Sequence, residues 1–323
     1  MCVGTTVSQY PNLPIMQSLN GFQVPASCAS EVLSLAKRHP HARDKNIAFD
    51  EEPHTYYIYG QTAGWVSVTT VVHEFFPAFN GQRVAQRMVR SPKFCKDKKY
   101  DMYQKYRLNE DGSTATESVL ISRILQSWTD NANSASALGT KLHRSIELFY
   151  NAEPTDNKSS EFMNHFYDFV AVQMMLDLEP FRTEWMIYSE DEQVCGSIDC
   201  IMRCKKTGKY AMFDWKRSKQ IRMKGFGGKG KGPVAHLQDC NYIHYSLQLN
   251  LYKYILEKNY GIYISTMNIV VFHPNNPTFL SFEIKDMQPT IKTVLESRSS
   301  STAQPTSTTV CPPADILAMF PSV

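Results

Sequence analysis

The chain has 323 residues, of which 42% are hydrophobic and 20% are charged. This length corresponds to about two average domains, or to one domain with additions, and the composition excludes a wholly disordered chain. Thirty-four Lys and Arg residues against 31 Asp and Glu residues leave a net charge of +3. The total charge therefore gives no argument for nucleic-acid binding, and any basic surface has to be local.

Membrane and secretory signals are absent from the sequence. No run of about 18 apolar residues occurs, and residues 1–25 lack a basic stretch followed by an apolar one. The eight cysteines form no Cys-x-x-Cys pair, which disfavours a disulfide scaffold or a zinc knuckle and favours reduced thiols. We therefore expect an intracellular protein, cytoplasmic or nuclear, that is not secreted and has no membrane partner.

The N-terminal part of the chain predicts an extension followed by a hairpin and helices. Residues 1–45 form the expected extension, with one short helix near 31–38. Two β-rich runs at 54–59 and 65–68 predict a hairpin across 60–64. Helices are expected at 70–76, capped by Ser67 or Thr69, and at 82–90. The polar residues 91–115 are expected to form a surface excursion, and 46–130 as a whole a hairpin and helical elaboration.

The remaining chain predicts an α/β (α+β) core over 131–298. Apolar spacing predicts separate helices at 118–128, 135–150 and 161–176. The period then changes to that of strands, expected at 182–189, 194–204, 209–216, 266–273 and 279–284, with helices at 243–259 and 288–298. Residues 299–323 are expected to be a disordered Ser/Thr/Pro-rich tail. Its apolar end, 314–320, is a candidate binding segment for a protein partner.

Two carboxylates and a lysine occur on consecutive predicted strands. Alternation places Asp214 and Lys216 on one face of their strand and Trp215 on the other. If this strand pairs with the preceding one as a hairpin, Asp199 lies beside Asp214. Two hard oxygen ligands suit Mg²⁺ or Mn²⁺, and a lysine can stabilise the charge of a reacting phosphate. Ordinary surface ion pairs are the alternative explanation.

Two predicted helices carry polar pairs four residues apart. His143 and Glu147 share one side of a helix, where the imidazole can face a metal and the carboxylate can orient it. Gln248 and Tyr252 share one side of a later helix and suit contacts to phosphate or base. Each pair alone is also typical of an ordinary helix surface.

A local basic stretch lies between these strands and the later helix. The basic segment, residues 216–231, holds seven basic residues, four glycines and no acidic residue. Such a segment can neutralise phosphates while its glycines let the backbone move. Besides Lys216, its candidate DNA-binding residues are Arg217, Lys219, Arg222, Lys224, Lys229 and Lys231.

Taken in order, these motifs resemble those of the PD-(D/E)xK nuclease superfamily and, within it, the RecB-like exonucleases. The family pattern is matched by Gly139…His143…Glu147, then Gly196…Asp199, then Asp214-Trp215-Lys216, then Gln248…Tyr252. The match covers about 135–285. The stretch 54–79 is also similar to the N-terminal part of viral and phage-type members.

The resemblance implies a restriction-endonuclease-like core, a mixed β-sheet flanked by helices. It implies His143, Asp199, Asp214 and the Trp215 carbonyl as metal-site groups, with Lys216 as the catalytic lysine. Glu184, which opens the preceding strand, is a further acidic candidate, and Glu147 could fill that role instead.

The expected activity is Mg²⁺-dependent hydrolysis of DNA phosphodiester bonds by an exonuclease acting in replication, repair or recombination. The expected partner is therefore DNA with single- or double-stranded ends, and no small-molecule cofactor is expected. Only Cys311 follows the Gln-x-x-x-Tyr helix, so no iron–sulfur cluster is expected, and no P-loop is present. A structure- or sequence-specific endonuclease of the same superfamily and a catalytically inactive DNA-binding scaffold are the alternatives.

Overall fold

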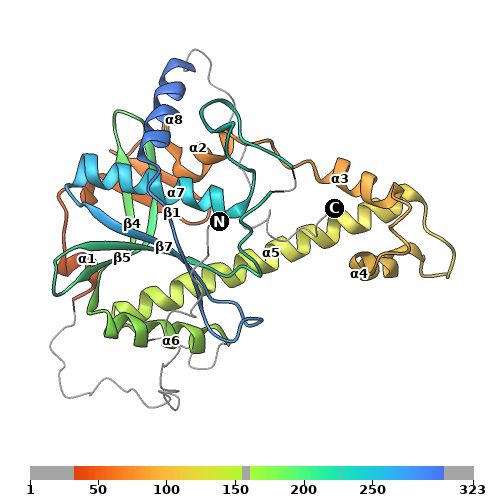
Figure 1. Cartoon of the computed structure of the whole chain (residues 1–323), viewed down its shortest axis with the longest axis horizontal. Helices are drawn as coiled ribbons and strands as arrows, with labels where there is room; N and C mark the ends of the chain where they lie inside the picture. Colours follow the sequence, from red (N-terminus) through yellow and green to blue (C-terminus); the bar gives the residue numbers. More distant parts are fainter. Residues whose placement is uncertain (1–32, 155–160, 226, 302–323) are drawn as a thin grey trace.

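The computed structural model describes residues 33–154, 161–225 and 227–301. Residues 299–301 of the predicted tail belong to the last helix, and the rest of that tail, with the apolar segment 314–320, lies outside the described residues. The molecule has a body built on a β-sheet and an arm that projects from it along one long helix (Figure 1). The helices are α1 (Leu35–Arg38), α2 (Val68–Glu74), α3 (Gly81–Arg90), α4 (Asp101–Gln104), α5 (Glu117–Tyr150), α6 (Glu161–Met175), α7 (Asn241–Ile255) and α8 (Gln288–Ser301). Within the described residues, no helix is both long and apolar enough to span a bilayer.

The body has the mixed α/β architecture that the sequence predicts. Six strands form its sheet, and two more form a separate small one. The strands are β1 (Ile47–Asp50), β2 (Thr55–Ile58), β3 (Val66–Ser67), β4 (Leu178–Ser189), β5 (Val194–Cys204), β6 (Tyr210–Lys216), β7 (Ile264–Val271) and β8 (Leu280–Glu283). Strand β5 is central: β4 pairs along one edge, while β3 and β6 pair with opposite ends of the other edge. The β3–β5 and β6–β7 ladders are parallel and the rest are antiparallel.

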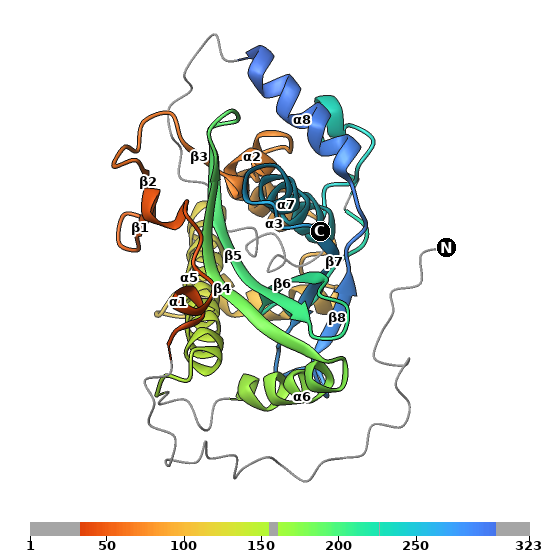
Figure 2. The same cartoon turned by 90° about the vertical axis from the view of Figure 1, so that its left-hand side faces the viewer.

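Helices cover both faces of the sheet. On one face, α2, α7 and α8 bury Val71, Leu249 and Ile291 in the largest core. On the other, the end of α5 and α6 bury Leu142 and Phe166 in a second core. Figure 2 shows the sheet between α7 and α8 on one side and α6 on the other. The alternation of apolar residues along β5 and β6 therefore feeds two cores at once, as expected for strands covered on both faces.

The hairpin predicted across 60–64 is wrong. Strand β2 pairs with β1, and β3 pairs in parallel with β5 in the main sheet. A turn held by the Ile58–Gln61 bridge sends the chain away from β2. The two residues of β3 then lead directly into α2, whose first turn is capped by Ser67 through a 3.1 Å hydrogen bond from the Thr70 N–H. The predicted cap is thus confirmed, although the predicted strand pairing is not.

The two helices predicted at 118–128 and 135–150 are one continuous helix, α5. None of the residues 129–141 is buried, because this stretch spans the gap between the core of the arm and the core of the body. Apolar periodicity vanishes there, yet the stretch contains no proline and several alanines, so the helix continues. The prediction of two separate helices is therefore wrong, because the apolar spacing is interrupted there while the helical backbone continues.

The predicted surface excursion at 91–115 is packed against α5. It holds two 3₁₀ turns and α4, and it buries Phe94, Tyr100 and Tyr103 in one core with Trp128 of α5. The Trp128 Nε1–H donates to the Tyr103 hydroxyl at 2.9 Å. We call residues 81–128 the arm, since they form this separate core.

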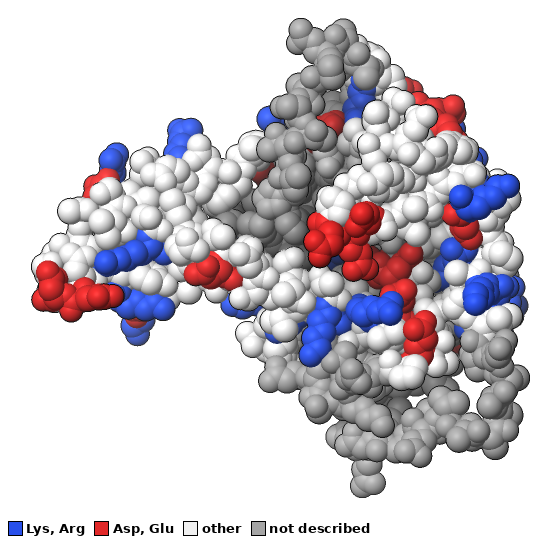
Figure 3. Space-filling view, turned by 180° about the vertical axis from the view of Figure 1, so that it is seen from behind, with Lys and Arg blue, Asp and Glu red and all other residues white. Residues whose placement is uncertain are grey.

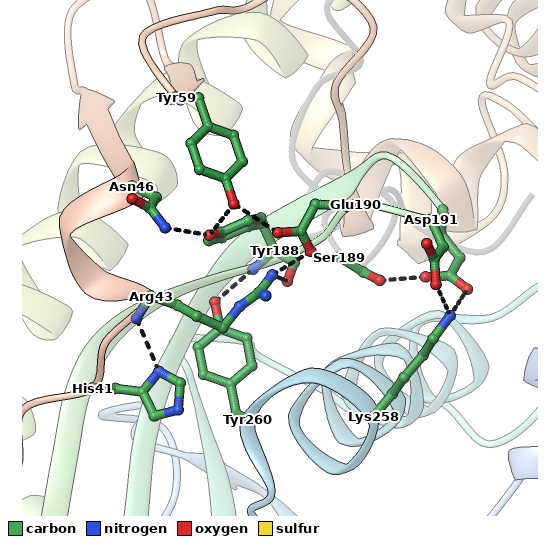
Figure 4. Close-up of polar contacts among 11 residues, drawn as sticks. His41, Arg43, Asn46, Tyr59, Tyr188, Ser189, Glu190, Asp191, Lys258 and Tyr260 are labelled. Atoms are coloured by element: carbon green, nitrogen blue, oxygen red, sulfur yellow. Dashed lines mark hydrogen bonds and ion pairs between the residues drawn. The ribbon is translucent and has the colours of Figure 1, made fainter.

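The segment before β1 is fastened to the turn between β4 and β5 (Figure 4). The Arg43 guanidinium lies 4.0 Å from the centre of the Tyr188 ring and donates to the Tyr188 carbonyl at 3.0 Å and to Glu190 at 2.5 Å. The Tyr59 hydroxyl donates to the other Glu190 oxygen at 2.8 Å. These contacts join the small β1–β2 sheet to the edge of the main sheet.

Candidate metal centre

The candidate site lies where β5 and β6 separate. Their ladder ends at the pair Cys200 and Phe213, so the next residues along the two strands are Asp199 and Asp214. Beyond that point β6 continues its ladder with β7. The Asp199 carboxylate takes the place of a backbone acceptor for the Trp215 N–H, which donates to its Oδ2 at 2.6 Å. The hairpin register predicted from the sequence is confirmed, and it brings the two aspartates to the point where the sheet opens.

Asp214 and Lys216 form a buried ion pair. Their side chains are 4% and 10% exposed, and Lys216 Nζ lies 2.7 Å from Asp214 Oδ2. The same ammonium lies 5.0 Å from the centre of the Tyr245 ring on α7. Trp215 points to the opposite face, into the core beneath α6, as strand alternation predicts. Burying both charges is costly, so a pair at this position is a feature typical of functional sites.

His143 reaches the same point from α5. Its Nε2 lies 3.0 Å from the Trp215 carbonyl oxygen, and its Nδ1 lies 3.3 Å from Glu184 Oε1 and 3.7 Å from Asp199 Oδ2. One ligand atom each from His143, Glu184 and Asp199 lie within 4.8 Å of one another. Helix α5 and the neighbouring strands β4 and β5 therefore contribute one side chain each to a single cluster.

Glu184 is the most unusual backbone position of the cluster. Its φ is +43°, in the left-handed region that non-glycine residues seldom occupy. Such a conformation persists only where the surrounding structure holds it, and it recurs at functional sites. The Ser197 hydroxyl donates to the second Glu184 oxygen at 3.4 Å. Glu184, the further acidic candidate of the sequence, therefore lies in the cluster.

Glu147, the alternative acidic candidate, is not part of the cluster. Its Oε2 accepts a hydrogen bond from Arg144 Nη1 at 2.6 Å, in an i, i+3 pair in which Arg144 is exposed and Glu147 is half-buried. The carboxylate beside His143 Nδ1 belongs to Glu184, 41 residues further along the chain. Side-chain spacing on one helix predicted the wrong orienting group, because β4 brings a nearer carboxylate.

The charges of the cluster depend strongly on one another. Burial lowers the pKa of His143, but the carboxylates of Asp199 and Glu184 outweigh it and raise that pKa to about 10. Burial raises the pKa of Asp214 to about 7, with Lys216 opposing and Asp199 adding to the rise. Burial also raises the pKa of Asp199. A metal ion at this site would compete with the His143 proton, since an imidazole ligand has to be neutral.

Tyr252 lines the opposite side of the opening in the sheet. Its hydroxyl accepts a 3.4 Å hydrogen bond from Gln248 Nε2 one turn earlier on α7. A Cβ added to Gly196 would lie 2.8 Å from Tyr252 Cε1 and 3.0 Å from its hydroxyl. Glycine is required at 196 because the tyrosine ring lies directly against its Cα. Gly196 and Tyr252, which are 56 residues apart in the sequence, thus constrain each other sterically.

Tyr56 on β2 lies near the site, although no motif in the sequence selects it. Burial raises the pKa of the Tyr56 hydroxyl, and the neighbouring groups that add to this rise include Tyr252, Glu184 and Asp199. Tyr56 also packs against a small core that contains Ile58, Tyr188 and Cys195, which places it beside β4 and β5. Strand alternation could have separated half-buried Tyr56 from exposed Tyr57, but only the packing of β1 and β2 against the main sheet identifies what Tyr56 meets.

In its described part after β6, residues 217–225 and 227–231, the basic segment is an ordered loop. Its backbone pairs with residues 237–239, and the Lys231 N–H donates to the Phe75 carbonyl at 2.8 Å. The glycines permit close packing: a Cβ at Gly225 would lie 2.2 Å from the Asp239 carbonyl oxygen, and one at Gly230 would lie 2.5 Å from a backbone oxygen. Gly225 and Gly230 therefore have a packing role in addition to the backbone freedom that the sequence predicts. The candidate phosphate-binding side chains that this loop exposes are Lys219, Lys224, Lys229 and Lys231, whereas Arg217 and Arg222 are half-buried.

The donor set of the cluster fits a hard divalent cation. Two carboxylates and one imidazole converge, and the Trp215 carbonyl oxygen lies next to the imidazole. Oxygen ligands are preferred by Mg²⁺, and the additional imidazole is well tolerated by Mn²⁺. Asp214 lies beside this group in its pair with Lys216, so it borders the centre.

Comparisons with known proteins leave the family of this chain open. No family model and no curated protein matches it. One of the solved structures that match is described as "Crystal structure of SSO0001"; it is 14% identical, covers 76% of this chain and 80% of its own, and superposes with a TM-score of 0.26. A score this low carries no argument about function.

Proposed function

We propose that this chain is a metal-dependent nuclease that hydrolyses DNA phosphodiester bonds and starts from a free end. The observation that carries the proposal is the convergence of His143, Glu184 and Asp199 within 4.8 Å, next to a buried lysine. An ordinary surface ion pair does not need three elements, a strained glutamate and a buried ammonium to form it. The order of the motifs along the chain, which resembles that of RecB-like exonucleases, supports the same conclusion.

The residues around the cluster have separable roles in such a reaction. His143, Glu184 and Asp199 would hold the cation, which when bound supplies Lewis-acid activation of the phosphate and of a water molecule. Asp214, at 2.7 Å, orients the Lys216 side chain, so an ammonium there can offset negative charge that develops on the phosphate. Since this group is already oriented before the substrate arrives, little reorganisation is needed during the reaction.

The sides of the site suit a nucleic-acid strand. Tyr252 presents a buried ring and hydroxyl next to the cluster, and Tyr56 approaches it from β2. The half-buried Tyr56 ring could stack on a base without sequence preference, whereas the buried Tyr252 would support the wall of the site. The exposed lysines of the basic segment follow Lys216 directly in sequence and provide positive charge for the phosphate backbone.

The proposal is tested by digestion of DNA labelled at the 5′ or the 3′ end, with Mg²⁺ or Mn²⁺, as linear and as covalently closed circular substrates. The wild type is compared with Asp199→Asn and Lys216→Met, and Glu147→Gln serves as the matched control outside the cluster. Expected are metal-dependent digestion of linear DNA only, a loss of at least a hundredfold in both site variants, and activity of the control within about twofold of wild type.

Three results would contradict the proposal in different ways. Digestion that is equal in wild type and Asp199→Asn would point to a contaminating nuclease. An inert wild type over both metals and all substrates would support an inactive DNA-binding scaffold. Cleavage of closed circles at defined sequences would support an endonuclease.

A further inference from the structure

The arm concentrates positive charge that the total composition conceals. Residues 81–107 contain nine Lys and Arg but only two Asp and Glu. Residues 81–107 and the basic segment, 216–231, make up 43 residues and hold 16 of the 34 basic side chains of the protein. The other 280 residues carry 18 basic and 29 acidic side chains, so they are strongly acidic. Two separate basic surfaces on an otherwise acidic chain need an explanation of their own.

The basic side chains of the arm are available for an external partner. All nine are exposed. Arg90 pairs with Glu117 at 2.8 Å and Lys99 lies 3.9 Å from Asp97, whereas the other seven form no ion pair with any residue that the structure describes. On α3, Arg83, Arg87 and Arg90 follow the i, i+4, i+7 spacing of one helix face and line a shallow groove together with Gln86 and Ser91. Figure 3 shows Lys and Arg side chains spread along the arm, and acidic ones over the middle of the body and near the outer end of the arm.

Helix α5 connects this surface rigidly to the candidate metal centre. The start of α3 contacts it near Leu125, since a Cβ at Gly81 would lie 3.3 Å from Leu125 Cδ2. The end of α3 contacts it at Glu117 through Arg90. His143 lies 18 residues beyond Leu125 and 26 beyond Glu117 on the same helix. At about 1.5 Å per residue, α3 therefore lies roughly 27–39 Å from the metal centre along the axis of α5.

We propose that the arm binds the phosphodiester backbone of DNA at a fixed distance from the bond that is cleaved. This inference rests on the proposed nuclease function and adds a second contact to it. At about 3.4 Å per base pair, the arm meets duplex DNA roughly 8–11 base pairs from the metal centre. The surface consists of exposed lysines and arginines spread along the arm. Positive charges distributed in this way contact the phosphates of the backbone, so we expect binding without preference for a base sequence.

The arrangement has a consequence for substrate length. DNA shorter than about 8 base pairs contacts the metal centre and the basic segment but does not reach the arm. Longer DNA gains further phosphate contacts, and each of them releases counterions. The contribution of the arm is therefore confined to long substrates and weakens steeply as salt concentration rises.

The test separates DNA binding from hydrolysis by measuring fluorescence anisotropy in EDTA. The probes are DNA hairpins with stems of 6 or 24 base pairs, single strands of 6 or 24 thymidines, and vesicles of phosphatidylserine and phosphatidylcholine. The arm variant removes four exposed, unpaired charges: Arg83→Gln, Arg87→Gln, Lys93→Gln and Lys96→Gln. The matched control removes four exposed charges elsewhere: Lys45→Gln, Lys205→Gln, Lys209→Gln and Lys292→Gln.

The expected result is a difference in salt dependence that appears only with long DNA. For the arm variant, the slope of log affinity against log salt on the 24-base-pair stem becomes shallower by about 3.6, from four contacts at about 0.9 each. If single strands are the bound form, the change occurs on the 24-nucleotide strand and is about 2.8. The affinity lost on the long probe exceeds that lost on the 6-mer by at least tenfold, and the control variant keeps the wild-type slope. Circular dichroism and the smaller variant Arg83→Gln/Arg87→Gln, with half the slope change, confirm that folding is intact.

Some outcomes overturn the inference about the arm and others the proposed function. Three outcomes overturn the role of the arm and leave the nuclease proposal standing. They are an unchanged salt slope on both long probes, an equal loss of affinity on long and short DNA, and charge-dependent binding to the vesicles in place of DNA. Arm-dependent DNA binding by a wild type that hydrolyses nothing overturns the nuclease proposal while the arm contact stands.

Discussion

Replacing Gly196 by alanine should disturb the site through Tyr252. The added Cβ would lie 2.8 Å from Tyr252 Cε1 and 3.0 Å from the hydroxyl, distances that a real methyl group does not tolerate. Tyr252 is 5% exposed and hydrogen-bonded to Gln248, so its ring cannot turn away freely. Either β5 or the ring has to move, and both belong to the candidate centre.

The magnitude follows from the cost of overpacking a buried position. Inserting one methyl group into a well-packed core costs about 1–3 kcal/mol. For a protein of this size the melting temperature should fall by about 2–12 °C. If the ring moves, its hydrogen bond with Gln248 is lost as well, and nuclease activity should fall together with stability.

A double-mutant cycle assigns the effect to the ring. Urea unfolding monitored by far-ultraviolet circular dichroism is measured for wild type, Gly196→Ala, Tyr252→Ala and the double variant. Removing the ring leaves space for the methyl group, so Gly196→Ala should cost less than about 0.5 kcal/mol in that background, and the coupling should amount to about 1–3 kcal/mol. Gly139→Ala is the matched control: nothing lies within 4 Å of its added Cβ, and alanine in this exposed helix should stabilise by about 0.5–1 kcal/mol.

An equal cost of Gly196→Ala with and without the tyrosine ring would refute this reasoning, because the clash would then lie elsewhere. A neutral or stabilising Gly196→Ala in the wild-type background would refute the steric requirement itself.

Three further predictions concern stability, metal binding and the basic segment. Burial raises the pKa of Asp44, but hydrogen bonds from Arg182 and Trp185 outweigh it and lower that pKa. The stability that this carboxylate contributes is therefore present above about pH 4 and is lost as the pH falls through the lowered pKa. Asp44→Asn should cost about 1.5–3 kcal/mol at pH 7, and urea titrations from pH 7 to 2 should show that this acid-dependent part is gone. Glu184→Gln should weaken Mn²⁺ binding at least tenfold in calorimetry, whereas Glu147→Gln should leave it within twofold, and equal effects would contradict the cluster. Gly225→Ala should open the ordered loop, because its Cβ would lie 2.2 Å from a carbonyl oxygen, and limited proteolysis should then cut within 217–231, where wild type resists.

Most of the centre could be predicted from the sequence because local pairing assembles it. Asp199 and Asp214 come together through a hairpin of two consecutive strands, whose register depends on the short turn between them. Lys216 follows from strand alternation. His143 follows from a helix with a clear apolar stripe, although its contacts to the strands are tertiary.

The parts that were missed depend on contacts between distant segments. Glu184 competes for its place with Glu147, and only the β4–β5 pairing and an unusual backbone conformation decide between them. Tyr56 enters through a small sheet whose docking depends on Arg43 and Glu190, residues with no local signal. The continuity of α5 was hidden because a bridging helix without a buried face has no periodicity to detect.

The exposed stretch of α5 also bears on how this protein can change over evolutionary time. Residues 129–141 bury no side chain, so insertions there disturb neither hydrophobic core. Seven added residues would lengthen the helix by about 10.5 Å and rotate its far end by only about 20°, because two helical turns are nearly completed. If the second connection to the body, residues 75–80, lengthened to match, the arm would be displaced by roughly three base pairs with its orientation almost preserved, whereas an insertion of two residues would turn it to another side. Length variation among descendants of this fold should therefore occur in steps of whole turns.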